Sequence, residues 1–121
     1  MQAPLEPHSI YALWNNFHER AEKEEQTIPD VPLYFMKPLT SVIGPEKIIY
    51  RPRGHQGRVI FEAELGIVIG SKCREVSESE AAEHIFGYTC VNDVTAVEFL
   101  FEDKAFQQWT RCKGFDTFTP I

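Results

Sequence analysis

Apolar and polar side chains alternate through the middle of the chain in a pattern typical of a β-strand. From Val59 to Ile69 every odd-numbered position is apolar, and successive side chains of a strand point to opposite faces of a sheet. We therefore expect a strand over this segment. Its odd face is predicted to lie in the core and consists of Val59, Phe61, Ala63, Leu65, Ile67 and Ile69.

The even face of the same segment carries two carboxylates, Glu62 and Glu64, among apolar neighbours. At about 3.3 Å of rise per residue these side chains leave the strand roughly 7 Å apart on one side. One interpretation is a half-buried strand whose solvent face happens to be acidic. The other interpretation is a pair of metal ligands in a cleft, which the flanking Ile60, Gly66 and Val68 favour because a solvated face normally carries more polar residues.

Shorter apolar runs, bounded by proline, glycine or polar residues, predict further extended segments at 33–36, 47–50 and 88–92. Residues 51–58 are basic but are interrupted by proline and glycine, which indicates a loop rather than a phosphate-binding patch. Residues 1–9 are rich in proline and polar residues, so we expect a flexible N-terminal segment before a single domain over residues 10–121.

Three helices are also predicted. Residues 18–26 are charged and lack β-branched side chains, which favours a mostly solvated helix. A capping box at 77–80 predicts a helix to about Phe86, with Gly87 as its C-terminal stop, and a second capping box at 95–98 predicts another. Asp93 then lies where a strand gives way to a helix, at the exposed end of an element.

Composition and charge limit the function classes. The chain has 121 residues, is 43% hydrophobic and carries a formal net charge of -6, which suits one globular domain and argues against a nucleic-acid partner. No apolar run is long enough to span a membrane and the start of the sequence does not resemble a signal peptide. The expected compartment is the cytoplasm.

The cysteines Cys73, Cys90 and Cys112 are odd in number and widely spaced, so neither a disulfide framework nor a zinc site is expected. Cys112 lies between Arg111 and Lys113, where a thiol could have a lowered pKa and act as a nucleophile. The pattern favours a packing role for Cys112 over a catalytic one.

Glu62, Glu64 and Asp93 together would offer only oxygen ligands. Such a set suits a hard cation, Mg²⁺, Mn²⁺ or Ca²⁺, better than zinc. The spacing of these residues does not by itself prove that the two predicted strands are neighbours.

Four segments, YFMKPLTS (34–41), FEAELGIVIG (61–70), GYTCVNDVTA (87–96) and CKGFDT (112–117), stand in the order and at about the spacing found in one known family. With them the chain resembles the N-terminal part of the catalytic domain of the fumarylacetoacetate hydrolase family. The resemblance implies an α+β fold that is mainly β, a mixed β-roll or distorted β-barrel, of which about half is present in this sequence. We expect a fragment of a longer product, the ordered part of one, or a chain completed by a partner.

The resemblance also implies a chemistry. Glu62, Glu64 and Asp93 are expected to bind Mg²⁺ or Mn²⁺, and Lys113 to reach the same pocket, the alternative for Lys113 being a solvated surface lysine. Family members act on 2-oxo acids or their enols by cleaving carbon–carbon bonds, decarboxylating, isomerising or hydrating. They commonly form homodimers.

For cleavage the family uses a histidine and glutamate pair on an early helix to activate water. His18 and Glu22, one helical turn apart, are the candidates here, although the family spacing falls on Arg20. Val97 and Leu100 stand where many members carry an arginine and a glutamine that contact the substrate.

Three functions follow as hypotheses. The first is metal-dependent hydrolysis of a carbon–carbon bond in an acylpyruvate-like diketo acid. The second is an isomerase, hydratase or decarboxylase on dienoic or 2-oxo dicarboxylic acids, which the imperfect histidine and glutamate pair favours. The third is a non-catalytic metal-binding domain, against which three like charges argue, because they repel each other unless an ion remains.

Overall fold

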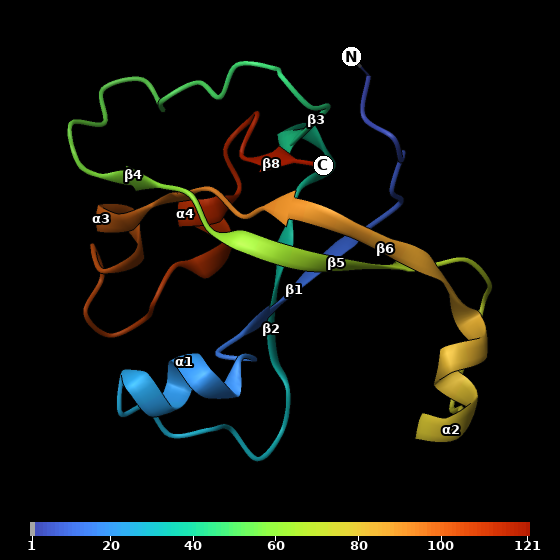
Figure 1. Cartoon of the computed structure of the whole chain (residues 1–121). Helices are drawn as coiled ribbons and strands as arrows, with labels where there is room; N and C mark the ends of the chain where they lie inside the picture. The colour runs from blue at the N-terminus through green and yellow to red at the C-terminus, as the bar shows by residue number, and fades with distance from the viewer. Residues whose placement is uncertain (1) are drawn as a thin grey trace.

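The computed structural model describes residues 2–121, which form four separate strand pairs connected by loops and short helices (Figure 1). The strands are β1 (Ile10–Trp14), β2 (Leu33–Lys37), β3 (Val42–Ile43), β4 (Val59–Ile60), β5 (Ala63–Ile69), β6 (Ile85–Asn92), β7 (Thr95–Ala96) and β8 (Thr119–Pro120). The helices are α1 (His18–Lys23), α2 (Glu78–Ala81), α3 (Val97–Leu100) and α4 (Trp109–Lys113), with short 3₁₀ helices η1 (Leu39–Ser41) and η2 (Ala82–His84). The strand-rich α+β class agrees with the prediction, and within residues 2–121 the strands do not close into a barrel.

Three strand pairs are antiparallel, β1 with β2, β4 with β7 and β5 with β6, whereas β3 pairs with β8 in parallel. The longest ladder joins β5 to β6, from Ala63 opposite Asn92 to Ile69 opposite Ile85. This pair runs across the picture in Figure 1, with α2 at its far end in the connection between the two strands. The strand predicted at 88–92 is therefore confirmed and begins earlier, at Ile85.

The odd face of β5 is exposed, which contradicts the predicted core. Leu65 is 61% exposed, Ile67 55% and Ile69 60%, and Phe86 and Tyr88 on β6 are exposed as well. The glutamate face is the half-buried one. Alternation shows that the two faces of a strand differ, but not which face packs against the rest of the chain, and here buried lysines from other elements meet the acidic side.

A small aromatic and aliphatic core lies beside the end of β6. Val94, Ala96 and Phe118 are buried in it, and Val59, Phe99 and Phe115 pack against them. The backbone N–H of Val94 donates to the carbonyl of Phe118 at 3.1 Å. This core fixes the segment that carries Asp93 and Thr95, which flank Val94 on either side.

A second aromatic cluster joins β2 to α4. Phe35 of β2 stacks on Trp109, the first residue of α4, with 5.9 Å between ring centroids. Trp14 of β1 packs on the same indole at 6.0 Å. Because α4 is pinned to β2 at this end, the lysines that end the two elements, Lys37 and Lys113, lie close together.

The predicted helix and extended segment near the N-terminus are confirmed, although the helix ends earlier. α1 covers His18–Lys23 rather than 18–26, and β2 covers the segment before Pro38. Residues 2–9 contain neither helix nor strand, and Met1 lies outside the described residues.

Three predictions about local structure are wrong. Residues 47–50 are not a strand, since the N–H of Tyr50 donates to the hydroxyl of Thr117 instead of to a neighbouring strand. The capping box at Ser77 and Glu80 is present, but the α-helix ends at Ala81 and Gly87 lies inside β6. The second capping box does not form, because Thr95 belongs to β7 and α3 begins after Ala96.

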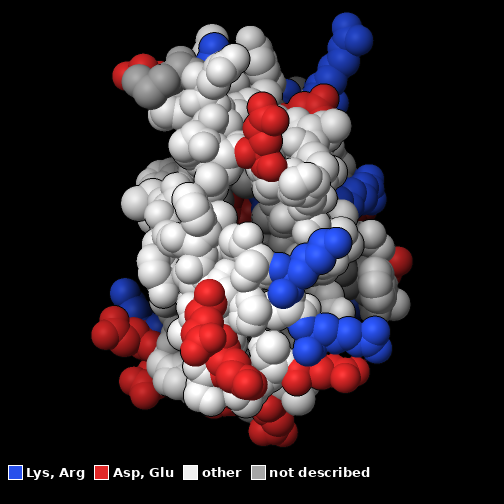
Figure 2. Space-filling view, turned by 90° about the vertical axis from the view of Figure 1, so that its right-hand side faces the viewer, with Lys and Arg blue, Asp and Glu red and all other residues white. Residues whose placement is uncertain are grey.

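Much of the surface lacks charge. On the face shown in Figure 2, uncharged residues cover most of the centre, with Lys, Arg, Asp and Glu scattered among them. Within residues 2–121 no helix has the length and apolar character needed to cross a bilayer.

Candidate functional site

Glu62 and Asp93 lie next to each other at the open end of the β5–β6 ladder. The last paired residues are Ala63 and Asn92, and one step beyond them the N–H of Asp93 donates to the carbonyl of Glu62 at 2.9 Å. The amide oxygen of Asn92 also accepts from the N–H of Glu62 at 3.2 Å. The hairpin therefore places the two carboxylates, 31 positions apart in the sequence, on neighbouring backbones.

Lys113, at the end of α4, inserts its ammonium between these carboxylates. Its Nζ donates to Oε1 of Glu62 and to Oδ2 of Asp93, both at 2.7 Å, and to Oγ1 of Thr95 at 2.6 Å. Only 2% of the Lys113 side chain is exposed, so it is not a solvated surface lysine. Three hydrogen bonds use all three N–H groups of the ammonium.

Lys37, at the end of β2, is a second buried lysine in the site and was missed by the sequence reasoning. Its Nζ donates to Oδ1 of Asp93 at 2.5 Å and to the backbone carbonyl of Lys113 at 2.7 Å. Burial lowers the pKa of Lys37, and the carboxylate of Asp93 opposes that shift. The sequence does contain a sign of this role. Lysine is seldom buried unless a partner neutralises its charge, so a lysine at the end of a short apolar strand, directly before Pro38, indicates a buried ion pair.

Thr95 is another site residue that the sequence reasoning did not assign. Its hydroxyl donates to Oε1 of Glu62 at 2.6 Å while accepting from Lys113. The sequence predicts a helix cap at this residue, but Thr95 lies in β7 and its side chain turns toward Glu62.

Glu64 lies one inward-facing position further along β5 and is half buried. Burial raises its pKa most, and the negative charges of Glu62 and Asp93 raise it further. These causes indicate that the three carboxylates share one negative environment. No hydrogen bond within residues 2–121 ties the Glu64 carboxylate to a partner.

The donor chemistry of this site fits a hard divalent cation. Oxygen atoms of Glu62 and Asp93 converge on one point, the Nζ of Lys113, and the Glu64 carboxylate belongs to the same environment. As the side chains stand, no three acidic, histidine or cysteine residues within 2–121 are gathered tightly enough to hold an ion. The positive group between Glu62 and Asp93 is the ammonium of Lys113.

The histidine and glutamate that were predicted to activate water, both on α1, lie apart from this cluster. His18 and Glu22 are both exposed, and within residues 2–121 no hydrogen bond or ion pair joins either of them to Glu62, Asp93 or Lys113. Arg20 of the same helix is exposed and pairs with Glu24 at 3.0 Å.

Cys112 does not have the properties of a catalytic nucleophile. It is buried, and burial raises the pKa of its thiol to about 11. This agrees with the packing role and contradicts the alternative of an activated thiolate. Cys73 and Cys90 are exposed free thiols.

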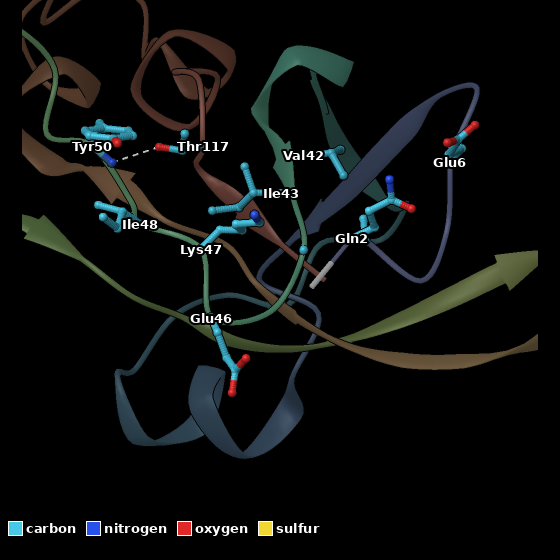
Figure 3. A pocket seen from close by; sticks show the side chains of 11 residues that line it. Gln2, Glu6, Val42, Ile43, Glu46, Lys47, Ile48, Tyr50 and Thr117 are labelled. Carbon is cyan, nitrogen blue, oxygen red and sulfur yellow. Dashed lines mark hydrogen bonds between the residues drawn. The ribbon is translucent and has the colours of Figure 1, made fainter.

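A separate open cavity lies away from this cluster. It has a volume of about 590 Å³ and is lined by the N-terminal segment and the loop after β3, as Figure 3 shows. Glu46, Lys47 and Thr117 are among its lining residues, while none of the carboxylates or lysines described above lines it. We place the functional site at the carboxylate cluster, because charged groups that are buried and mutually paired are found there and not in the open cavity.

Comparisons with known proteins bear on the family to which the chain belongs. Residues 9–121 match the family model for the fumarylacetoacetate (FAA) hydrolase C-terminal domain. An uncharacterized protein of Archaeoglobus fulgidus is 46% identical over 98% of the chain, which spans 46% of that protein.

Solved structures of similar fold include two isomerases. The 5-carboxymethyl-2-hydroxymuconate delta-isomerase of Mycobacterium smegmatis is 40% identical with a TM-score of 0.83, over 98% of this chain and 46% of that one. The 2-hydroxyhepta-2,4-diene-1,7-dioate isomerase of Mycobacterium marinum is 38% identical with a TM-score of 0.81, over 98% and 42%. The chain thus spans about half the length of the proteins that it matches. By the match over residues 9–121, it belongs to the fumarylacetoacetate hydrolase family.

Proposed function

We propose that this chain carries the divalent-cation site of an enzyme that isomerises a dienoic or 2-oxo dicarboxylic acid through its enol form. The observation that carries the proposal is the convergence of Glu62 and Asp93 on the buried ammonium of Lys113. The isomerases among the similar structures support the reaction class.

Glu62, Glu64 and Asp93 would hold the ion, with Mg²⁺ or Mn²⁺ preferred and Ca²⁺ a further candidate. When bound, such an ion acts as a Lewis acid that polarises the 2-oxo group and stabilises negative charge on the enolate oxygen.

The charges of the site suit an anionic substrate. Three ionised carboxylates against the two ammonium groups of Lys37 and Lys113 leave one net negative charge, and a divalent cation turns this into one net positive charge. One carboxylate of the substrate would neutralise this charge, and the second carboxylate of a dicarboxylic acid would need a partner outside this set of residues. Lys113 would stabilise negative charge on the enolate oxygen through its own positive charge, since its three N–H groups are already donated to Glu62, Asp93 and Thr95.

Hydrolysis of a carbon–carbon bond in an acylpyruvate-like diketo acid is the second candidate. The pair of His18 and Glu22 on α1 favours it, since a histidine and a glutamate one helical turn apart could activate water. Isomerisation is preferred because both residues of the pair are exposed, and Val97 and the buried Leu100 offer no polar group to a substrate.

The first test is calorimetric titration of Mg²⁺ and Mn²⁺ into the purified chain, with Glu62→Ala as the control. Saturable binding that the control loses supports the cation site, and equal binding by both proteins contradicts it. Absence of binding by both contradicts the proposal for this chain on its own, and repeating the titration on a longer product containing the rest of a family domain asks whether that part completes the site.

The reaction is tested by incubating the Mg²⁺-loaded protein with a set of 2-oxo acids in D₂O and following proton NMR spectra. A double bond that moves, with deuterium at the newly protonated carbon and no change in carbon count, indicates isomerisation, whereas release of pyruvate indicates hydrolysis. Metal binding without any turnover would favour the non-catalytic hypothesis. A homodimer and a cytoplasmic location stay predictions. Light scattering after size-exclusion chromatography tests the homodimer by measuring the molar mass in solution.

A further inference from the structure

The two buried lysines of the site have different kinds of partner. Lys113 donates only to side chains, those of Glu62, Asp93 and Thr95. Lys37 donates to one side chain, Asp93, and to one backbone carbonyl, that of Lys113. The Lys37 side chain is 1% exposed, so water does not compete for these bonds.

As a result, the two oxygens of Asp93 are not equivalent. Oδ1 accepts from Lys37 and Oδ2 accepts from Lys113. The backbone carbonyl that also holds Lys37 belongs to α4, which Trp109 pins to Phe35 of β2. Lys37 therefore has a partner that cannot rotate away, whereas every partner of Lys113 is a side chain that can.

We infer that Lys37 is a positioning residue that sets which divalent cation the site prefers, by keeping Oδ1 of Asp93 occupied so that this carboxylate offers one oxygen only. The inference rests on the proposed cation site. Mg²⁺ requires near-octahedral geometry at about 2.1 Å and takes single carboxylate oxygens together with water. Ca²⁺ accepts roughly six to eight oxygens and often binds both oxygens of one carboxylate. Lys37 thus leaves Oδ2, which the Lys113 side chain contacts, as the one oxygen of Asp93 that an ion could take, and this favours Mg²⁺ or Mn²⁺ over Ca²⁺.

The test compares dissociation constants for MgCl₂ and CaCl₂, measured by calorimetry on the wild-type chain, Lys37→Met and Lys72→Met. Lys72 is exposed in the connection after β5, so its substitution removes the same charge without touching Asp93. In Lys37→Met, Oδ1 becomes free to bind an ion, and we expect the calcium-to-magnesium affinity ratio to rise roughly tenfold. Lys72→Met is expected to keep the wild-type ratio.

The ratio separates this role from two simpler ones. Loss of a nearby positive charge would strengthen binding of both divalent ions alike, and loose packing would weaken both alike. If Lys37→Met is unfolded by circular dichroism, Lys37→Gln carries the test, since its shorter polar side chain also releases Oδ1 and the ratio is expected to shift in the same direction.

An unchanged ratio in a folded Lys37 variant overturns the inference while leaving the cation site intact. A wild-type chain that prefers Ca²⁺ also overturns it. A wild-type chain that binds neither ion overturns the proposed function together with this inference, and the wild-type titration alone reveals that case.

Discussion

Lys113 is almost fully buried among Glu62, Asp93 and Thr95, so its charge is compensated only within the site. Replacing it by methionine leaves the Glu62 carboxylate without a counter-charge and leaves Asp93 with Lys37 alone. We expect Lys113→Met to lower the free energy of unfolding by about 3–5 kcal/mol in the presence of a chelator. Urea unfolding followed by circular dichroism measures the change.

Arg111→Met provides the matched control on the same helix. The Arg111 side chain is 49% exposed and pairs with the exposed Glu102, so its loss is expected to change stability by less than about 1 kcal/mol. Added Mg²⁺ should restore part of the stability of Lys113→Met, because an ion that binds only the folded state stabilises it. A loss below 1 kcal/mol in Lys113→Met would contradict the compensated cluster.

Cys112 allows a test by thiol reactivity. Cys73 and Cys90 are exposed, whereas Cys112 is buried and its pKa is raised to about 11. We therefore expect two thiols of the folded protein to react fast with DTNB at about pH 8, and the third to react only after denaturation. Because the thiol ionises at its usual value of 9.0 in the unfolded chain, its contribution to stability is full below pH 9.0 and is lost as pH rises toward 11. Cys112→Ser should keep both fast thiols and Cys73→Ser only one, and a third fast thiol in the wild type would contradict the burial.

At the residue scale, sequence reasoning found the residues that a family pattern marks and missed those that only packing reveals. The family pattern marks Glu62, Asp93 and Lys113 from the sequence alone. Lys37 lies 56 positions from Asp93, and its role depends on β2 reaching α4, which no local pattern encodes. The residues from Thr95 to Glu98 match the pattern of a capping box. Thr95 nevertheless pairs with Ile60 as part of β7, and this pairing determines its conformation.

At the scale of elements, the β5–β6 hairpin shows what periodicity can and cannot predict. The strands were expected from alternation and from the apolar run at 88–92, and both form. Which face of the hairpin is buried depends on the side on which Lys37 of β2 and Lys113 of α4 lie. Glu62 and Asp93 can be buried on the inner side of the hairpin because these two ammonium groups neutralise their charges.

The inner face of the hairpin also sets a steric requirement at Gly66. A Cβ on this residue would lie 2.8 Å from a methyl carbon of Val91 and 3.0 Å from one of Thr89, so we expect Gly66→Ala to destabilise by about 1–3 kcal/mol through overpacking. Gly87 on the paired strand has open space for a Cβ, and Gly87→Ala is expected to be neutral or stabilising. Urea unfolding of both variants makes the comparison, and equal effects would be evidence against this packing.

At the scale of the whole molecule, the apolar outer face of the hairpin is the feature least expected of a separate globular domain. Exposed apolar patches of this kind are uncommon on monomeric proteins, and the chain spans about half the length of its relatives. The sequence could not reveal this exposure, because the same alternation would be read from a strand covered on that side.

This exposure predicts how matched substitutions to threonine behave. Ile67 is 55% exposed and Val94 2%, so Ile67→Thr should change the free energy of unfolding by less than about 0.5 kcal/mol. Val94→Thr, which buries a hydroxyl, should cost about 1–3 kcal/mol. Urea titrations at two protein concentrations measure both. A large cost for Ile67→Thr that grows with concentration would mean that another molecule covers the face in solution, since burial by the chain itself does not depend on concentration.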